Sequence, residues 1–134
     1  MNARTFALIF GIVFLAVGIL GFGIVPGVLT DQQGSGMQVS GMLLGKFHVN
    51  ALHNIIHILF GLWGLLASRS WRGALVYARS IAIIYFLLAI AGLLPATQTG
   101  FGLLPLYAKD VWLHGLIALG GLYFGWAARG ADRL

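Results

Sequence analysis

The fold follows from residues 47–68, which read FHVNALHNIIHILFGLWGLLAS. This stretch contains no charged residue, and its polar side chains are confined to histidines and asparagines in its first half and a final serine. A helix needs about 20 mainly apolar residues to cross a membrane, which matches the length of this stretch. Residues 47–68 therefore predict one transmembrane helix.

Three further apolar runs have similar length and predict three more spans: residues 6–25, 74–94 and 111–128. Pro26 and Pro95 follow the first and third runs closely. A cleaved signal peptide is the alternative for the first run, but that run is longer than a typical signal and lacks an A-x-A-like cleavage site. Between the first two spans lies a polar, glycine-rich loop, residues 30–45.

The composition supports the same fold class. The 134 residues are 60% hydrophobic and 8% charged, with a mean hydropathy of +0.95, whereas soluble domains carry about 25% charged residues. We therefore expect a single domain, residues 1–134, that is all-α and forms an integral membrane bundle of four transmembrane helices. The basic residues form no cluster that is typical of nucleic-acid binding. Cysteine is absent, which excludes disulfides and thiolate metal sites.

The distribution of basic residues predicts the orientation. Lys46 and Lys109 fall on one side of the predicted membrane. The remaining basic residues fall on the other side: Arg4, Arg69, Arg72, Arg79, Arg129 and Arg133. Lysine and arginine are enriched on the cytoplasmic side of membrane proteins. Both termini and the short turn at residues 69–73 are therefore expected to be cytoplasmic.

The two halves of the chain resemble each other. Residues 21–26 read GFGIVP and residues 91–95 read AGLLP, and each stretch precedes a loop and then a polar residue with a histidine: Asn50 and His53 in the first half, Asp110 and His114 in the second. Both halves run outward and then back, as in a parallel repeat. We expect two similar helical hairpins, in which the second and fourth helices face each other.

The second and fourth helices carry a polar stripe in their outer halves. By the helical repeat of 3.6 residues, one face of the second helix holds Asn50, His53, Asn54 and His57. Asp110 and His114 share a face of the fourth helix. At about 1.5 Å per residue these histidines lie roughly 7–15 Å inside the membrane, a depth at which ionisable groups face the bundle interior. The stripe predicts a polar pocket on the outer side.

Small residues follow on the same two faces. They are Gly61 and Gly64 on the second helix, and Gly121 and Gly125 on the fourth. Glycine allows helix backbones to approach closely. These positions predict that the second and fourth helices touch near the cytoplasmic side and separate outward.

The polar stripe allows several chemical roles. It could consist of hydrogen bonds that hold helices together. His53 and His57, spaced by four residues, could instead bind a metal with His114 as a third ligand, or serve as axial ligands of a haem. A buried histidine could also donate a hydrogen bond to a quinone. Asp110 lies one turn before His114 and could orient its imidazole.

An enzymatic role is not indicated. The acidic residues are Asp31, Asp110 and Asp132, and only Asp110 falls beside the predicted pocket. A hydrolase or transferase needs a nucleophile with a neighbouring base, and the pocket residues contain no such pair.

Two motifs resemble a known family. They are HNIIH at residues 53–57 with Gly61 and Gly64, and FGLLPLYAKDVWLH at residues 101–114. Together they resemble the bacterial family called domain of unknown function 4383, small four-helix membrane proteins similar to the DoxX group. The resemblance implies the fold and a place in the bacterial cytoplasmic membrane. It marks these recurrent polar positions without assigning a role: His53, Asn54, His57, Asp110 and His114. The DoxX similarity implies association with respiratory or redox complexes.

We expect a non-catalytic accessory subunit of a larger membrane complex, of an energy-converting, redox or photosynthetic kind. Its partners would be the lipid bilayer and other membrane subunits or a second copy of the chain. The first alternative is a redox protein whose histidine-lined pocket holds a metal, haem or quinone. The second is a small transporter or proton relay, since ionisable residues reach mid-membrane.

Overall fold

A computed structural model describes residues 1–128 and is mainly helical. Its helices are α1 (Ala3–Leu20), α2 (Ala51–Ala67), α3 (Trp71–Leu93) and α4 (Ala108–Leu122), and α4 continues as a π-helix, Tyr123–Ala127. Both α1 and α3 are long and apolar enough to cross a membrane. Residues 1–128 therefore contain four α-helices, of which two have the length and composition of membrane spans.

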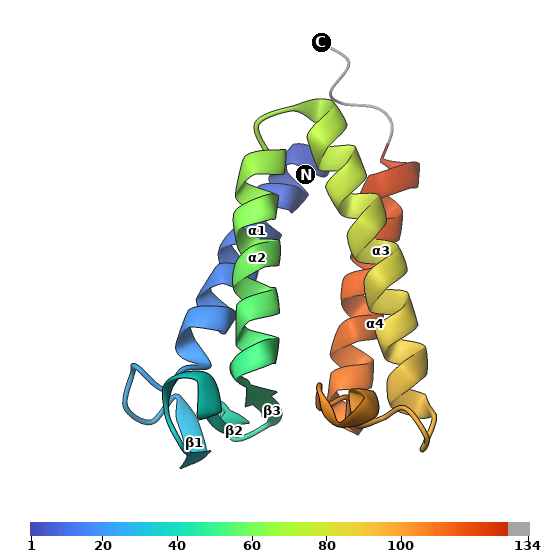
Figure 1. Cartoon of the computed structure of the whole chain (residues 1–134). Helices are drawn as coiled ribbons and strands as arrows, with labels where there is room; N and C mark the ends of the chain where they lie inside the picture. The colour runs from blue at the N-terminus through green and yellow to red at the C-terminus, as the bar shows by residue number, and fades with distance from the viewer. Residues whose placement is uncertain (129–134) are drawn as a thin grey trace.

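The helices form two pairs (Figure 1). α1 packs along α2, and α3 packs along α4. The pairs lie close together at the end where a short turn joins α2 to α3, which we call the turn end, and they diverge toward the opposite end. Six residues that pack at the turn end are completely buried: Ala3, Phe6, Ala7, Ala74, Tyr77 and Ala78. The space between the two pairs, filled by side chains, is called the seam below.

A small antiparallel sheet lies beyond α1 and α2 at the opposite end, which we call the sheet end (Figure 1). Its strands are β1 (Leu29–Gln33), β2 (Ser40–Leu43) and β3 (Phe47–Asn50), in the order β1-β2-β3. The all-α prediction is therefore incomplete, because part of the predicted loop at residues 30–45 forms strands. Leu44 and Gly45 have φ values of 54° and 65° and reverse the chain between β2 and β3. The strands are short and largely polar, so their sequence lacks a clear alternating pattern.

The sheet also shortens the second helix. Residues 47–50 were expected to be helical, but they pair with β2 through contacts such as Met42 opposite His48. α2 begins only at Ala51. The residue before it, Asn50, caps the helix by accepting a hydrogen bond from the backbone N–H of His53. Backbone pairing and a cap thus move this boundary by four residues, although the apolar run itself is continuous.

Caps likewise shift the other helix boundaries. Asn2 accepts a hydrogen bond from the Thr5 N–H, so α1 begins at Ala3 rather than at residue 6. Ser70 accepts one from the Gly73 N–H, so α3 begins at Trp71 rather than at residue 74. At its other end α1 stops at Leu20, before the predicted residue 25, because the chain turns at Gly23 with a φ of 72°.

Gly61, Gly121 and Gly125 pack within the pairs, and Gly64 lies against both α1 and α3. A β-carbon on Gly61 would lie 2.6 Å from the Leu15 backbone nitrogen of α1. A β-carbon on Gly121 would lie 2.7 Å from the Ala78 carbonyl oxygen of α3, and Gly125 lies against Arg79 of the same helix. The expectation that these glycines join α2 to α4 is wrong, because each helix uses them against its sequence neighbour.

The two halves repeat one arrangement of arginines at the turn end. Arg4 Nε donates a hydrogen bond to the Ser68 carbonyl at the end of α2, at 2.9 Å. Arg79 Nε donates one to the Gly125 carbonyl in the π-helix that continues α4, also at 2.9 Å. Helix C-termini leave carbonyls without helical partners, and a cation satisfies them well. Two of the arginines used to predict orientation, at positions 129 and 133, lie outside the described residues.

Candidate functional site

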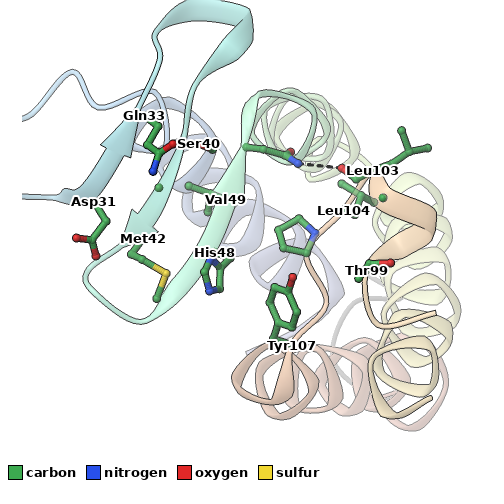
Figure 2. Close-up of a pocket in the computed structure, with 14 residues that line it drawn as sticks. Asp31, Gln33, Ser40, Met42, His48, Val49, Thr99, Leu103, Leu104 and Tyr107 are labelled. Atoms are coloured by element: carbon green, nitrogen blue, oxygen red, sulfur yellow. Dashed lines mark hydrogen bonds between the residues drawn. The ribbon is translucent and has the colours of Figure 1, made fainter. Parts of the chain in front are cut away.

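Asn50 connects the two helix pairs at the sheet end. β3 delivers it in extended conformation to the start of α2, where its Oδ1 caps the helix at 2.9 Å from the His53 nitrogen. Its Nδ2 donates a second hydrogen bond, also 2.9 Å long, to the Leu103 carbonyl in the loop before α4. This bond is drawn as a dashed line in Figure 2. One asparagine therefore both starts α2 and holds the loop of the second pair.

The first turns of α2 place three predicted site residues together. His53 Nδ1 lies 3.4 Å from Asn54 Oδ1, and the rings of His53 and His57 stack at a centroid distance of 4.1 Å. Asn54 is 0% exposed and lies against Gly21, where a β-carbon would collide with its amide. Glycine at the end of α1 is thus what allows a polar side chain to be fully buried at this point.

A row of rings crosses the seam from α2 to α4. His57 meets Phe14 edge-on at 5.2 Å, Phe14 stacks on Tyr85 at 5.4 Å and 6°, and Tyr85 meets His114 edge-on at 5.2 Å. The structure thus connects the predicted residues His57 and His114 through two aromatic residues that the sequence did not single out. Phe14 and Tyr85 are almost completely buried, and from sequence they look like ordinary core residues.

Spacing in the two halves makes His57 the counterpart of His114. Each lies seven residues after the residue that precedes its helix, Asn50 for α2 and Tyr107 for α4. The sequence had instead aligned His53 with His114. The ring of His57 stacks on that of His53 and is linked to that of His114 through Phe14 and Tyr85, and we call the three imidazoles together with Asn54 the cluster.

Asp110 has a structural role at the start of α4. Its Oδ2 accepts a hydrogen bond from the Tyr107 N–H at 3.1 Å, and its side chain is only 6% exposed. A carboxylate in the first helical turn also interacts favourably with the helix dipole. The sequence suggested that this carboxylate orients His114, whereas the structure uses it to cap α4.

Three buried nitrogen atoms of the cluster have no hydrogen-bond partner within the described chain: Asn54 Nδ2, His57 Nδ1 and His114 Nδ1. An unsatisfied buried polar group costs about 1–3 kcal/mol, so three at one place call for an explanation. Within residues 1–128, no group of three or more His, Cys, Asp or Glu side chains could hold a metal ion. The three unpartnered atoms are hydrogen-bonding groups that a bound molecule could satisfy.

A cavity of about 690 Å³ opens at the sheet end (Figure 2). The sheet contributes Asp31, Gln33 and Ser40 to its lining, and the loop before α4 contributes Thr99. Four residues line it close to the start of α2 and α4: His48, Asn50, Leu103 and Tyr107. The rings of His48 and Tyr107 meet at 5.0 Å. We call this space the outer cavity. The sequence predicted a polar pocket on the outer side, but of its predicted residues Asn50 alone lines this cavity, and the sheet that forms one wall was not predicted.

Two substitutions at Asn50 separate its two hydrogen bonds. Asn50→Ala removes both and is expected to destabilise the protein by about 2 kcal/mol, since loss of an asparagine cap alone costs about 1 kcal/mol. Asn50→Asp keeps an acceptor for the His53 N–H but cannot donate to the Leu103 carbonyl, so its effect should be smaller. Thermal unfolding in detergent micelles measures both. Equal destabilisation by the two variants would show that the cap contributes nothing.

Together these features define a small, mostly helical protein in which two helices could cross a membrane and a histidine–amide cluster lies between two helix pairs. The chain belongs to the family described as domain of unknown function (DUF4383), whose model matches residues 4–127. The predicted family is therefore confirmed. No curated protein and no solved structure matches the chain.

Proposed function

We propose that this protein is an integral membrane protein with four spans and cytoplasmic termini, and that it serves as a non-catalytic accessory subunit of a larger membrane complex. The observation that carries the proposal is the apolar outer surface of the helices. Large apolar side chains are exposed on every helix, among them Ile12, Leu59, Phe86 and Leu119. Water disfavours such continuous apolar surface, whereas lipid or neighbouring subunits cover it without cost.

The helix lengths support four spans. α1 and α3 have 18 and 23 residues. α4 and its π-helical continuation together run from Ala108 to Ala127, which is close to the length of a crossing. α2 has only 17 residues, but it is uncharged and packs along α1. A helix of this length fits a bilayer that thins locally around it.

The cytoplasmic location of the turn end is tested by labelling. The chain has no cysteine, so single cysteines can be introduced without removing any. Met37→Cys lies at the sheet end and is 72% exposed, and Arg69→Cys lies in the exposed turn. In intact cells an impermeant thiol reagent should modify Met37→Cys only, and after lysis it should modify both. The reverse pattern would place the sheet end in the cytoplasm.

The accessory role is tested by gentle purification from native membranes, followed by mass spectrometry and an optical spectrum of the same sample. We expect other membrane subunits in a fixed ratio, with any pigment belonging to them. An energy-converting, redox or photosynthetic complex would be recognised by its own cofactors. A stable, colourless monomer that retains no subunit in mild detergents would contradict the accessory role. The purification uses an affinity-tagged chain. Cells that contain the untagged chain, processed identically, provide the control.

One observation favours a second function, which is binding of a cofactor in the seam. The three unpartnered nitrogens come from both helix pairs, two from α2 and one from α4. An amide N–H and two imidazoles could donate to the carbonyl oxygens of a lipid-soluble ligand such as a quinone. Extraction of the purified protein with organic solvent would detect such a ligand. His114→Leu should abolish its retention, whereas His48→Leu, which alters a histidine outside the cluster, should not.

A further inference from the structure

Polar groups follow one another along α2 and α4 between the outer cavity and the seam. Asn50 lines the cavity and bonds the His53 backbone, His53 lies against Asn54, and its ring stacks on His57. On the α4 side, Tyr107 lines the same cavity and bonds Asp110, one turn before His114. On both helices, polar side chains therefore lie between the outer cavity and the unpartnered nitrogens.

At the turn end the seam is closed by apolar packing. Phe6, Tyr77 and Ala78 are completely buried there, and the Phe6 ring stacks against Phe124 at 5.1 Å. Gly64 lies against the hydroxyl of Tyr77, so α2 and α3 approach within van der Waals distance at this level. The Tyr77 hydroxyl, a polar group at this level of the seam, already has a partner, because it donates a hydrogen bond to the Phe60 carbonyl at 3.3 Å.

We propose that the seam binds water, that this water enters from the outer cavity only, and that it hydrogen-bonds Asn54, His57 and His114. Buried water typically makes two to four hydrogen bonds to polar groups that otherwise lack partners, and the cluster offers three such atoms. The aromatic rings of Phe14 and Tyr85 lie at the centre of the seam, between His57 and His114. The seam thus contains a hydrated space that is open at the sheet end and closed at the turn end.

This proposal does not depend on the accessory role, because it can be tested on the isolated chain. Single cysteines replace His57 and His114 in the otherwise cysteine-free protein, reconstituted in vesicles of phosphatidylethanolamine and phosphatidylglycerol. The matched controls are Leu59→Cys and Leu116→Cys, at similar depth on the same helices, where the side chains are 59% and 64% exposed on the outer surface. Ala78→Cys reports on the closed end.

A small charged methanethiosulfonate reagent is added on the side where Met37→Cys reacts. Thiolate is the reactive form and is suppressed in lipid, so we expect His57→Cys and His114→Cys to react at least about tenfold faster than Leu59→Cys and Leu116→Cys. Ala78→Cys should stay unmodified. Equal rates at histidine and leucine positions would overturn hydration of the seam. Modification of His57→Cys by reagent present only on the Arg69 side would overturn its one-sidedness.

A second measurement keeps the cluster unaltered, in case a cysteine variant does not fold. The His48→Gln variant, labelled with ¹⁵N-histidine in bilayers, retains only the three histidines of the cluster. We expect a solid-state NMR experiment to show transfer of magnetisation from water to the imidazole nitrogens. If none of the three imidazoles receives magnetisation from water, the proposal is wrong.

Discussion

Replacement of Gly64 by leucine is expected to destroy the folded state, whereas the same replacement at Gly115 should leave it intact. A β-carbon at position 64 would lie 2.8 Å from the Ala7 carbonyl oxygen, the Gly11 α-carbon and the Tyr77 hydroxyl. Backbone on α1 and a buried tyrosine on α3 cannot all move away. Overpacking of a core costs about 1–3 kcal/mol for a few added methylenes, so a leucine at this contact should cost at least about 3 kcal/mol.

Gly115 is the matched control because its surroundings are open. Apart from the adjoining residues and the backbone of α4 itself, no atom lies within 4 Å of a β-carbon built at this position, and the residue lines an apolar groove of about 990 Å³ between α3 and α4. Yield of monodisperse protein and its unfolding temperature in detergent would measure both variants. A Gly64→Leu protein as stable as Gly115→Leu would show that the three helices do not meet at this residue.

Loss of the Arg79 side chain is expected to have the second-largest effect. In Arg79→Met, the Gly125 carbonyl loses its 2.9 Å partner, and Trp126 loses the guanidinium that lies 5.2 Å from its ring centroid. Hydrogen bonds to charged groups contribute about 1.5–3 kcal/mol and cation–π contacts about 0.5–2 kcal/mol. We expect Arg79→Met to destabilise the protein by about 2–4 kcal/mol and to loosen the π-helix after α4.

Arg72→Met is the control for Arg79→Met, because both lose one positive charge at the same end while Arg72 is exposed. Arg4→Met removes the equivalent bond to Ser68 in the first half, but that bond is exposed and should contribute less. Unfolding in detergent and hydrogen exchange of residues 123–127 would compare the variants. If Arg72→Met and Arg79→Met had equal effects, the loss of charge alone would explain them.

The helices could be predicted because they depend on local composition. Apolar runs of roughly 20 residues identified all four, and α3 was placed within three residues at either end. Their ends could not be placed as well, because caps and backbone pairing set them. Asn50 illustrates this. It ends β3, where it pairs with Ser40 of β2, and its side chain accepts the hydrogen bond from the His53 N–H that caps α2.

The candidate site was only partly predictable. Helical spacing placed His53, Asn54 and His57 together, and these residues do lie in one cluster. The same reasoning assigned Asp110 to His114, but the backbone N–H of Tyr107 is a nearer donor for this carboxylate at the start of α4. Phe14 and Tyr85 could not be recognised, since only the packing of four helices brings their rings between the imidazoles.

The sequence by itself determined the class of protein, the number of helices and the polar face of α2, because hydrophobicity and helical repeat act over neighbouring residues. Only the tertiary structure decided which helices the glycines join. A small residue shows that a backbone can approach but not which one, and α2 and α4 each approach their sequence neighbour. The outer cavity likewise exists only in three dimensions, because its walls come from a sheet and a loop separated by about half of the chain.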